Sequence, residues 1–448
     1  MSEWKKVKIG DFLTEREGRY KPNDKEISKY QRLDKIDFSG HIHISDKPTK
    51  TDMIIVFPGD LIISGINVAK GAISVYQGKE PVCATIHYSS YTFDDKKVDL
   101  DYFKYFVKSP AFIFALQQQV KGGIKTEIKP KHLLPLEISL PDLSTQKEIV
   151  KVLSKKIEKV ELVKSEIESQ KNYAKQLRQN ILQEAIEGKL TEEWRKENPV
   201  VKGNPDFDAE SLFEKIQEEK CHTDSELLRN SKKKVFESIS ENEQPFEIPE
   251  GWKWVKLEHL AEVGTGATPL TSEKKYYENG TIPWITSSST GNDFVSKADV
   301  FITEIALKET NCSLNPKGTL VVAMYGQGKT RGQITELCIE AATNQACATI
   351  RIFEKDNVVL KKYIKFVFKK MYEEIRSLAQ GGTQPNLNLG KIANTIFPLP
   401  PLAEQKEIVS RVEKLLANVT ELEKQITERE EMTKQLMQSI MKDAFREE

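Results

Sequence analysis

Leu140-Pro-Asp-Leu-Ser-Thr-Gln-Lys-Glu-Ile-Val150 and Leu399-Pro-Pro-Leu-Ala-Glu-Gln-Lys-Glu-Ile-Val409 are two versions of one sequence, 259 residues apart. The similarity extends without a gap from 122–185 to 381–444, with 19 identities in 64 aligned pairs. A gapless match of this length indicates that the chain contains two copies of one unit.

Upstream of this match the two copies diverge. Trp4–Ile9 resembles Trp252–Leu257 at an offset of 248, and Gly59–Ile63 resembles Gly318–Val322 at 259. We also align Cys83–Ile86 with Cys347–Ile350. The second copy therefore carries about 11 extra residues near its start. A divergent front half on a repeated back half predicts one scaffold that presents two different recognition surfaces.

The back half of each copy predicts a long helix. Apolar residues recur at gaps of three and four, which is the a/d pattern of a coiled coil, so we expect the two helices to pack together. Gly188 is placed to end the first helix, and the Leu-Pro pairs stop the structure before each one. The residues assigned to helix pairing and partner binding are Ile149, Leu153, Val160, Ile167, Leu177, Ile181, Ile408, Val412, Leu415, Leu422, Ile426 and Leu436.

The front halves are expected to be mixed α/β. Short apolar runs bounded by Gly and Pro predict strands at Met53–Phe57, Leu61–Ser64, Ile282–Thr286, Leu320–Met324 and Ala346–Phe353. Amphipathic patterns predict helices at Tyr102–Gln119, Leu360–Ala379 and Ala209–Lys220. The predicted organisation is a first domain (1–145), a helix (146–188), an acidic connector (189–250), a second domain (251–400) and a second helix (401–448).

Composition limits the classes of function. The 448 residues carry 67 Lys plus Arg and 67 Asp plus Glu, so the chain is not a wholly basic nucleic-acid coat protein. No apolar run is long enough for a membrane span, and Met1–Phe12 lacks the apolar stretch of a signal peptide. Five cysteines without a C-x-x-C pair indicate a reduced compartment and no zinc site. We therefore expect a cytoplasmic protein with no metal and no membrane contact.

One stretch fits a permissive phosphate-loop pattern. In Ala323-Met-Tyr-Gly-Gln-Gly-Lys-Thr330, Lys329 would reach the outer phosphates and Thr330 would hold magnesium. The following residues, Arg331–Ile334, predict a strand rather than the helix that such a loop needs, so nucleotide hydrolysis is kept only as an alternative. A DNA methyltransferase would need a glycine-rich loop for the methyl donor and an acidic or Asn-Pro-Pro-aromatic catalytic loop, and neither is visible. No Ser/His/Asp set of catalytic residues can be assigned.

Side chains that could contact DNA are easier to name. Arg and Lys read guanine in the major groove, and Asn and Gln read adenine. Polar loops of both front halves carry such residues, together with small hydroxyl side chains. The candidates are Arg32, Asn67, Lys70, Lys121, Lys125, Thr286, Ser287, Gln327, Lys329, Arg331, Asn344, Gln345 and Gln384.

The chain resembles the DNA-specificity subunits of Type I restriction-modification systems over nearly its whole length. The resemblance rests on the two Leu-Pro-x-Leu-x-x-Gln-Lys-Glu-Ile-Val motifs and on Gly-Lys-Leu-Thr-x-x-Trp-Arg-x-Glu-Asn-Pro at 188–199. Met-Tyr-Gly-Gln-Gly-Lys-Thr-Arg-Gly at 324–332 and Gly251-Trp252 add to it. The first front domain is short and lacks the Met-Tyr-Gly loop.

The resemblance implies a non-catalytic adaptor. Two target-recognition domains would each read half of a split, asymmetric site in double-stranded DNA. The two antiparallel coiled-coil helices, related by an internal pseudo-two-fold repeat, would space the domains and dock two modification (methyltransferase) subunits. Restriction (motor–nuclease) subunits complete such systems. No cofactor is expected on this chain, because S-adenosylmethionine, ATP and magnesium would bind to the partners. A coiled-coil scaffold without a DNA role is the second alternative.

Overall fold

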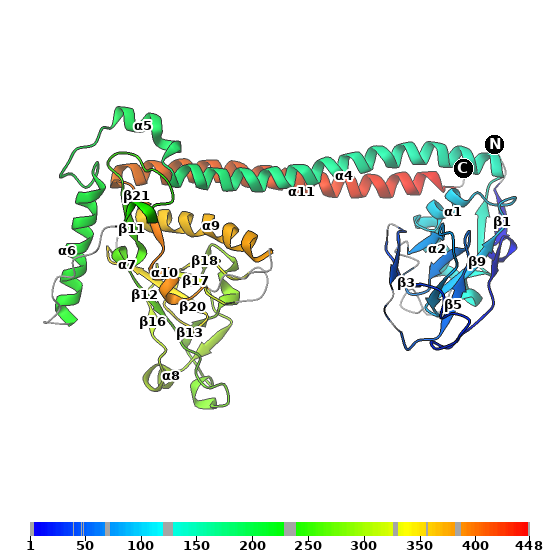
Figure 1. The fold of residues 1–448 in the computed structure, drawn as a ribbon, viewed down its shortest axis with the longest axis horizontal. Helices are drawn as coiled ribbons and strands as arrows, with labels where there is room; N and C mark the ends of the chain where they lie inside the picture. Colours follow the sequence, from blue (N-terminus) through cyan, green and yellow to red (C-terminus); the bar gives the residue numbers. More distant parts are fainter. Residues whose placement is uncertain are drawn as a thin grey trace. The chain divides into compact units, whose positions relative to one another are not determined.

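The computed structural model describes residues 4–38, 40–45, 47, 49–67, 72–119, 129–227, 239–325, 330–354, 357–380 and 387–446 (Figure 1). The chain forms two compact units. The first unit comprises Met1–Gln170 and Gln425–Glu448, and the second unit comprises Lys171–Lys424. Among the described residues, no helix is long and apolar enough to cross a membrane.

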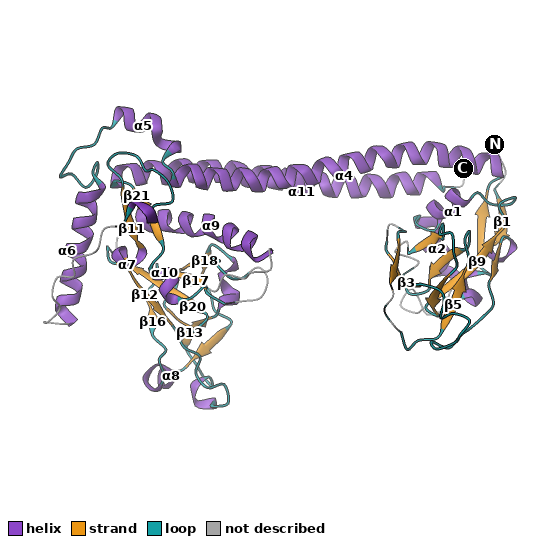
Figure 2. Cartoon of the chain, viewed as in Figure 1, coloured by secondary structure: helices purple, strands orange, loops and turns teal. Residues whose placement is uncertain are grey.

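The first unit contains two four-stranded sheets, which are ordered β2-β9-β6-β7 and β4-β3-β8-β5, and a separate β1-β10 pair. Figure 2 shows the strands in orange. The strands are β1 (Lys5–Lys8), β2 (Leu13–Glu15), β3 (Arg32–Ile36), β4 (Ile42–Ser45), β5 (Met53–Val56), β6 (Leu61–Ser64), β7 (Ile73–Val75), β8 (Val82–Thr85), β9 (Tyr88–Phe93) and β10 (Glu137–Leu140).

Three short helices cover the core of the first unit: α1 (Leu100–Phe106), α2 (Pro110–Gln119) and α3 (Pro130–Leu133). The single helix predicted over Tyr102–Gln119 is therefore wrong. Proline is favoured in the first turn of a helix and disrupts a helix interior, so Pro110 starts a second helix. The Ser109 hydroxyl accepts a hydrogen bond from the Phe112 amide (3.3 Å) and caps that start.

The second unit repeats this architecture with sheets ordered β12-β20-β17-β18-β14 and β15-β13-β19-β16 and a β11-β21 pair. Its strands are β11 (Lys253–Lys256), β12 (Ala261–Thr265), β13 (Ile282–Ile285), β14 (Phe294–Val295), β15 (Val300–Ile302), β16 (Leu314–Asn315), β17 (Leu320–Ala323), β18 (Ile334–Leu337), β19 (Ala341–Thr343), β20 (Cys347–Ile352) and β21 (Ile396–Leu399). Its short helices are α7 (Leu257–Leu260), α8 (Glu304–Glu309) and α10 (Leu389–Ala393), and α9 (Val358–Gln380) is longer.

The five strands predicted in the two front halves are confirmed, and so is the helix predicted at Leu360–Ala379, which is α9. The observed boundaries differ from the predicted ones by at most two residues. The mixed α/β class is likewise confirmed, because strands and helices alternate irregularly and both parallel and antiparallel neighbours occur in one sheet.

Strand register defines the repeat more sharply than sequence similarity does. Leu61 pairs with Tyr91 in the first unit, and Leu320 pairs with Ile350 in the second, so both partners are shifted by 259. Cys83 in β8 faces Arg32 in a parallel pair. The equivalent parallel pair joins Trp284 to Ala342.

This register corrects one sequence alignment. The equivalent of Cys83 is Ala342 rather than Cys347, so the alignment of Cys83–Ile86 with Cys347–Ile350 is wrong by five residues. The shared tetrapeptide lies in β8 of one copy and in the neighbouring strand β20 of the other. The offset is 248 at Lys8 and Lys256, and 252 at Arg32 and Trp284. The extra residues of the second copy are therefore divided between the two sides of β13.

The long helices are α4 (Leu143–Ile186) and α11 (Leu402–Ala444). Helix α4 begins three residues before its predicted start at residue 146, because the Asp142 carboxylate accepts a hydrogen bond from the Thr145 amide (2.9 Å). This backbone hydrogen bond lowers the pKa of Asp142. At the other end, Gly188 adopts a left-handed φ of 74°, which a residue with a Cβ rarely takes.

The glutamine of each Leu-Pro-x-Leu-x-x-Gln-Lys-Glu-Ile-Val motif has the same structural role in both copies. Gln146 and Gln405 are fully buried, and each side-chain amide donates to the carbonyl of the preceding proline turn, at Pro141 and Pro400, over 2.8 Å. A buried amide requires such partners. The motif therefore fixes the turn from the last strand of each domain into its long helix.

The seam of the helix pair, meaning the line along which α4 and α11 contact each other, has one buried residue in every seven. In α4 these residues are Leu153, Val160, Ile167, Ala174 and Ile181, and in α11 they are Val412, Val419, Ile426 and Thr433. Two hydrogen bonds between the helices, Arg429 to Gln170 (2.8 Å) and Arg178 to Glu423 (2.9 Å), establish an antiparallel arrangement. Gln170 and Arg429 are equivalent positions of the two copies, 259 residues apart.

Three predicted pairing residues lie outside this seam. Leu177, Leu422 and Leu436 are 43%, 46% and 53% exposed. The second row of the seam runs through Arg178 and Glu423 instead, which pair with each other and turn the neighbouring leucines outward. Of the other predicted pairing residues, Leu153, Val160, Ile167, Ile181, Ile408, Val412 and Ile426 are buried, and Ile149 and Leu415 are half-buried.

The connector begins with a 3-10 turn (Lys189–Thr191) and α5 (Glu192–Glu197), and continues into α6 (Ala209–Leu227). Helix α6 packs on the second domain, where Gln217 donates to the His259 carbonyl (2.6 Å) and Lys215 pairs with Glu354 (3.0 Å). The connector thus belongs structurally to the second unit.

Candidate nucleic-acid interface

Several predicted site residues of the second unit meet at one edge of its sheets. Strands β13 and β19 are parallel, so both end at this edge, where the Asn344 amide donates to the Ile285 carbonyl (3.0 Å). Thr286 and Ser287 follow β13, and Asn344 and Gln345 follow β19. The Thr286 and Ser288 hydroxyls share a hydrogen bond (2.7 Å). Two polar loops are thereby brought side by side.

The second sheet supplies two further segments to the same edge. The Met324 amide donates to the Ala346 carbonyl (2.8 Å), which places the end of β17 beside the 343–346 turn. Arg331 lies on the far arm of this hairpin, where the Gly332 amide donates to the Ala323 carbonyl (2.8 Å). Tyr325, which sequence reasoning missed as a candidate, is 49% exposed here.

The chain after β12 also reaches the edge. The Thr265 hydroxyl donates to the Cys347 carbonyl (2.8 Å), and the Thr268 hydroxyl donates to the Gln345 side-chain oxygen. A Cβ at Gly266 would lie 1.7 Å from the Thr343 carbonyl oxygen, so only glycine fits this approach. Gly266 therefore lets the chain after β12 pack directly against the end of β19.

The structure thus brings together Thr286, Ser287, Arg331, Asn344 and Gln345. Gln327, Lys329 and Gln384 lie outside the described residues. The phosphate-loop alternative loses its structural basis, because the loop after β17 leads into the antiparallel strand β18. A phosphate loop needs a helix N-terminus after it.

The first unit offers a smaller equivalent edge. The Gly65 amide donates to the His87 carbonyl (2.9 Å), so the loop that carries Asn67 lies beside the 85–88 turn. Asn67 is half-buried. The predictions at Lys70, Lys121 and Lys125 fall outside the described residues.

Arg32, which the sequence predicts to contact DNA, is largely buried in an ion pair. Its guanidinium pairs with Asp34 (2.6 Å), and only 16% of the side chain is exposed. Sequence reasoning missed two more exposed cations nearby. Arg19 and Lys21 pair with Asp52 (2.8 and 3.2 Å), whose backbone carbonyl accepts from the Ile86 amide of the turn. The hydrogen bonds from Lys21 and Arg19 lower the pKa of Asp52.

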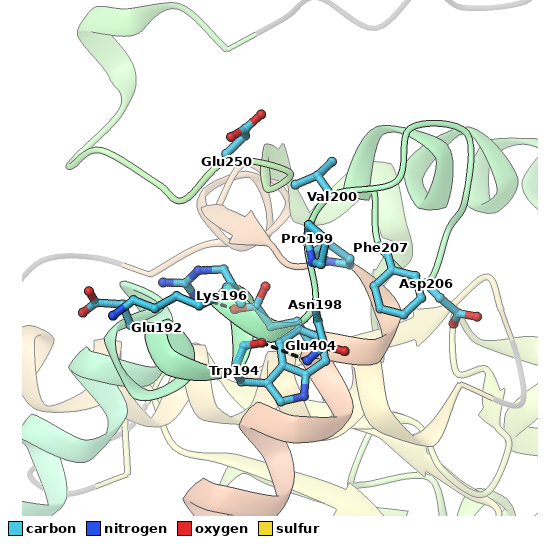
Figure 3. Close-up of a pocket in the computed structure, with 12 residues that line it drawn as sticks. Glu192, Trp194, Lys196, Asn198, Pro199, Val200, Asp206, Phe207, Glu250 and Glu404 are labelled. Carbon is cyan, nitrogen blue, oxygen red and sulfur yellow. Dashed lines mark hydrogen bonds and ion pairs between the residues drawn. The ribbon is translucent and has the colours of Figure 1, made fainter.

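The 188–199 motif has a structural role. The Glu404 carboxylate, 2% exposed, accepts hydrogen bonds from Arg195 (2.5 Å), Thr191 (2.6 Å) and the Trp252 indole (2.7 Å). These donors come from the motif and from Gly251-Trp252, so two separately noted signatures converge on one buried carboxylate. Figure 3 shows the adjacent surface cavity, to which Trp194, Phe207 and Glu404 contribute. The cluster fastens the connector to the start of α11.

Among the described residues, no group of three or more His, Cys, Asp or Glu side chains is placed to hold a metal ion. Cys347, which is fully buried, has a thiol pKa raised by burial to about 12, so it is a packing residue rather than a nucleophile.

Several known proteins resemble this chain. It is 32% identical over 171 residues to the Type I restriction enzyme MjaIX specificity subunit of Methanocaldococcus jannaschii, over 36% of this chain and 37% of that protein. It is 23% identical to the EcoKI specificity subunit of Escherichia coli K12, over 88% of this chain and 75% of that protein. The match to the EcoDI specificity subunit of Escherichia coli spans 66% of that protein.

A solved structure shares the fold. A chain described under "complex assembly and conformational transition of the type I R-M system" superposes with a TM-score of 0.66 at 14% identity, covering 99% of this chain and 98% of that chain. Residues 1–170 and 249–431 match the family described as Type I restriction modification DNA specificity domain. These two ranges contain both front domains and most of both long helices, and so the chain belongs to the Type I restriction-modification DNA specificity family.

Proposed function

We propose that this chain is the non-catalytic, sequence-specific DNA-binding subunit of a Type I restriction-modification complex, and that each recognition domain reads one half of a bipartite, asymmetric site. One observation carries the proposal. The two domains share their strand order and register, apart from the additional edge strand β14 of the second domain, yet they present different side chains at equivalent loop positions.

The 259 offset identifies these positions. Thr85 and Ile86 in the first domain correspond to Asn344 and Gln345 in the second. Amides read hydrogen-bonding base edges, whereas threonine and apolar side chains suit the thymine methyl group. One fold with two different sets of readers supports two different half-sites.

The long helices supply the surface for partner subunits in this proposal. Leu177 and Leu422 immediately precede the paired Arg178 and Glu423, so both leucines lie on one side of the helix pair in the second unit. In the first unit, Val163 and Leu436 are each seven residues from the bonded Gln170 and Arg429, and they are exposed on the corresponding side. Exposed apolar side chains gathered on one side of the helix pair favour binding of a partner protein.

We propose that two modification subunits bind there and that restriction subunits join them. S-adenosylmethionine, ATP and magnesium would then bind to those partners. The target adenine would be flipped into a partner's pocket, so this chain would need no catalytic site.

A methylation map tests the function. The chain is co-expressed with its modification subunit in an unmethylated host, and genomic N6-methyladenine is located by sequencing. A split motif with a fixed gap is the expected result. No new methylation, with both proteins soluble and associated, would contradict an active specificity subunit and favour a scaffold.

Docking is tested separately by co-purification. Leu422→Asp should abolish association with the modification subunit, because a carboxylate would be buried in the apolar contact. Leu162→Asp is the matched control: Leu162 is 66% exposed and lies two residues after the buried Val160, on the outer side of α4. Equal retention of the partner by both variants would exclude the proposed docking surface.

A further inference from the structure

The 343–346 turn of the second domain is held rigidly from several directions. Its backbone bonds to Ile285 of β13 through Asn344 and to Met324, just after β17, through Ala346. The Thr265 hydroxyl donates to the Cys347 carbonyl beyond the turn. Gly266 packs directly against Thr343. A turn fixed in this way presents its side chains in one orientation, which is the condition for reading a base edge.

Both amide side chains of the turn have their oxygens engaged within the domain. The Asn344 side-chain oxygen accepts from the Ala346 amide (3.2 Å), and the Gln345 side-chain oxygen accepts from the Thr268 hydroxyl. An amide oxygen has two lone pairs and the NH2 group has two donor hydrogens, so a bond to the oxygen sets the direction of both groups. Anchoring each oxygen to the protein makes the NH2 group the one available to a ligand.

Two adjacent NH2 groups match a base edge that presents only hydrogen-bond acceptors. In the major groove guanine presents N7 and O6 as acceptors, whereas adenine presents one acceptor and one donor. Free Asn or Gln pairs best with adenine, because both ends of the amide are used. The hydrogen bond from Thr268 occupies one lone pair of the Gln345 oxygen and fixes where that oxygen points, which disfavours the two-ended adenine pairing.

We propose that Asn344 and Gln345 read a guanine in the half-site of the second domain, and that Thr268 is the positioning residue that sets this preference. The inference rests on the proposed function. It reverses the adenine preference expected from these residue types alone. The first domain has Thr85 and Ile86 at the equivalent positions, so its half-site provides an internal control in every experiment.

The test compares methylation maps of the assembled methyltransferase complex carrying the wild-type chain, Gln345→Ala, Gln345→Glu, Thr268→Val and Thr268→Ser. Gln345 is exposed, so its substitutions do not disturb the core. In Gln345→Ala, methylation at sites lacking one particular guanine should rise about tenfold or more relative to intact sites. Gln345→Glu should favour cytosine there, because a carboxylate accepts from its amino group.

Thr268 separates positioning from bulk structure. Thr268→Val keeps the shape of the side chain but loses the hydroxyl, so the freed Gln345 amide should accept adenine at the same position. Thr268→Ser keeps a hydroxyl donor and should retain the preference for guanine. The other half-site should stay unchanged in all variants. A uniform fall in methylation across all sequences would identify a phosphate contact and overturn the proposal, as would an unchanged motif or an adenine at the affected position. A wild-type map without a split motif would refute the proposed function itself.

Discussion

Glu404 shows how one residue explains sequence signatures that lie far apart along the chain. Its carboxylate is buried, and its three donors come from residues 191, 195 and 252. A buried carboxylate is tolerated only when its hydrogen bonds are satisfied. The Gly-Lys-Leu-Thr-x-x-Trp-Arg motif and the Gly-Trp pair are therefore parts of one local structure, and neither has to contact DNA.

Glu404→Ala should destabilise the second unit by about 3–5 kcal/mol, because it leaves the partly buried Arg195 guanidinium without its counter-ion. The measurement is urea unfolding followed by tryptophan fluorescence, to which Trp252 contributes directly. Glu407→Ala is the control on the same helix, since Glu407 pairs with Arg411 at a part-exposed site and should cost about 0.5 kcal/mol. Similar midpoints for the two variants would show that the buried cluster contributes little.

At the scale of elements, the sequence predicts most of the fold. Strands such as Leu61–Ser64 and both long helices follow from apolar runs and from heptad spacing. The break at Pro110 is missed because the apolar pattern continues on both sides of it. The correct equivalent of Cys83 could be identified only from the strand register, because a match of four residues does not distinguish two successive strands.

The candidate site is predicted less completely. Thr286, Arg331, Asn344 and Gln345 come from the sequence as polar loop residues, but their convergence depends on which strands are parallel. Thr268 carries no sequence signal of its own, because its role is a single hydrogen bond across 77 residues. Periodicity likewise cannot tell which of two apolar rows in a helix faces its partner.

The seam between α4 and α11 gives a matched pair of substitutions. Val419 is 1% exposed, whereas Leu422, three residues later, is 46% exposed. Val419→Asp should cost several kcal/mol, because a charge would be buried without a partner. Leu422→Asp should change the free energy of unfolding by less than about 1 kcal/mol. Circular dichroism during urea unfolding measures both, and equal losses would mean that the seam is assigned wrongly.

At the scale of the whole molecule, this chain lacks the net positive charge that is typical of proteins that bind DNA without partner subunits. It carries 67 basic and 67 acidic side chains, so its overall field does not attract a polyanion. Base-reading amides and hydroxyls give sequence preference, but phosphate contacts supply most of the affinity. Little general attraction to DNA suits the proposed function, in which partner subunits close around the duplex and supply phosphate contacts.

The isolated chain should therefore bind DNA weakly and with a shallow dependence on salt. With about three phosphate contacts, affinity should fall roughly 40-fold between 50 and 200 mM salt, against a thousandfold or more for six to ten contacts. Fluorescence anisotropy with a duplex containing the mapped site measures both quantities, and a scrambled duplex is the control. Adding the modification subunit should tighten binding and steepen the slope, because its cations would join the interface. Tight, steeply salt-dependent binding by the chain alone would place the phosphate contacts on this chain instead.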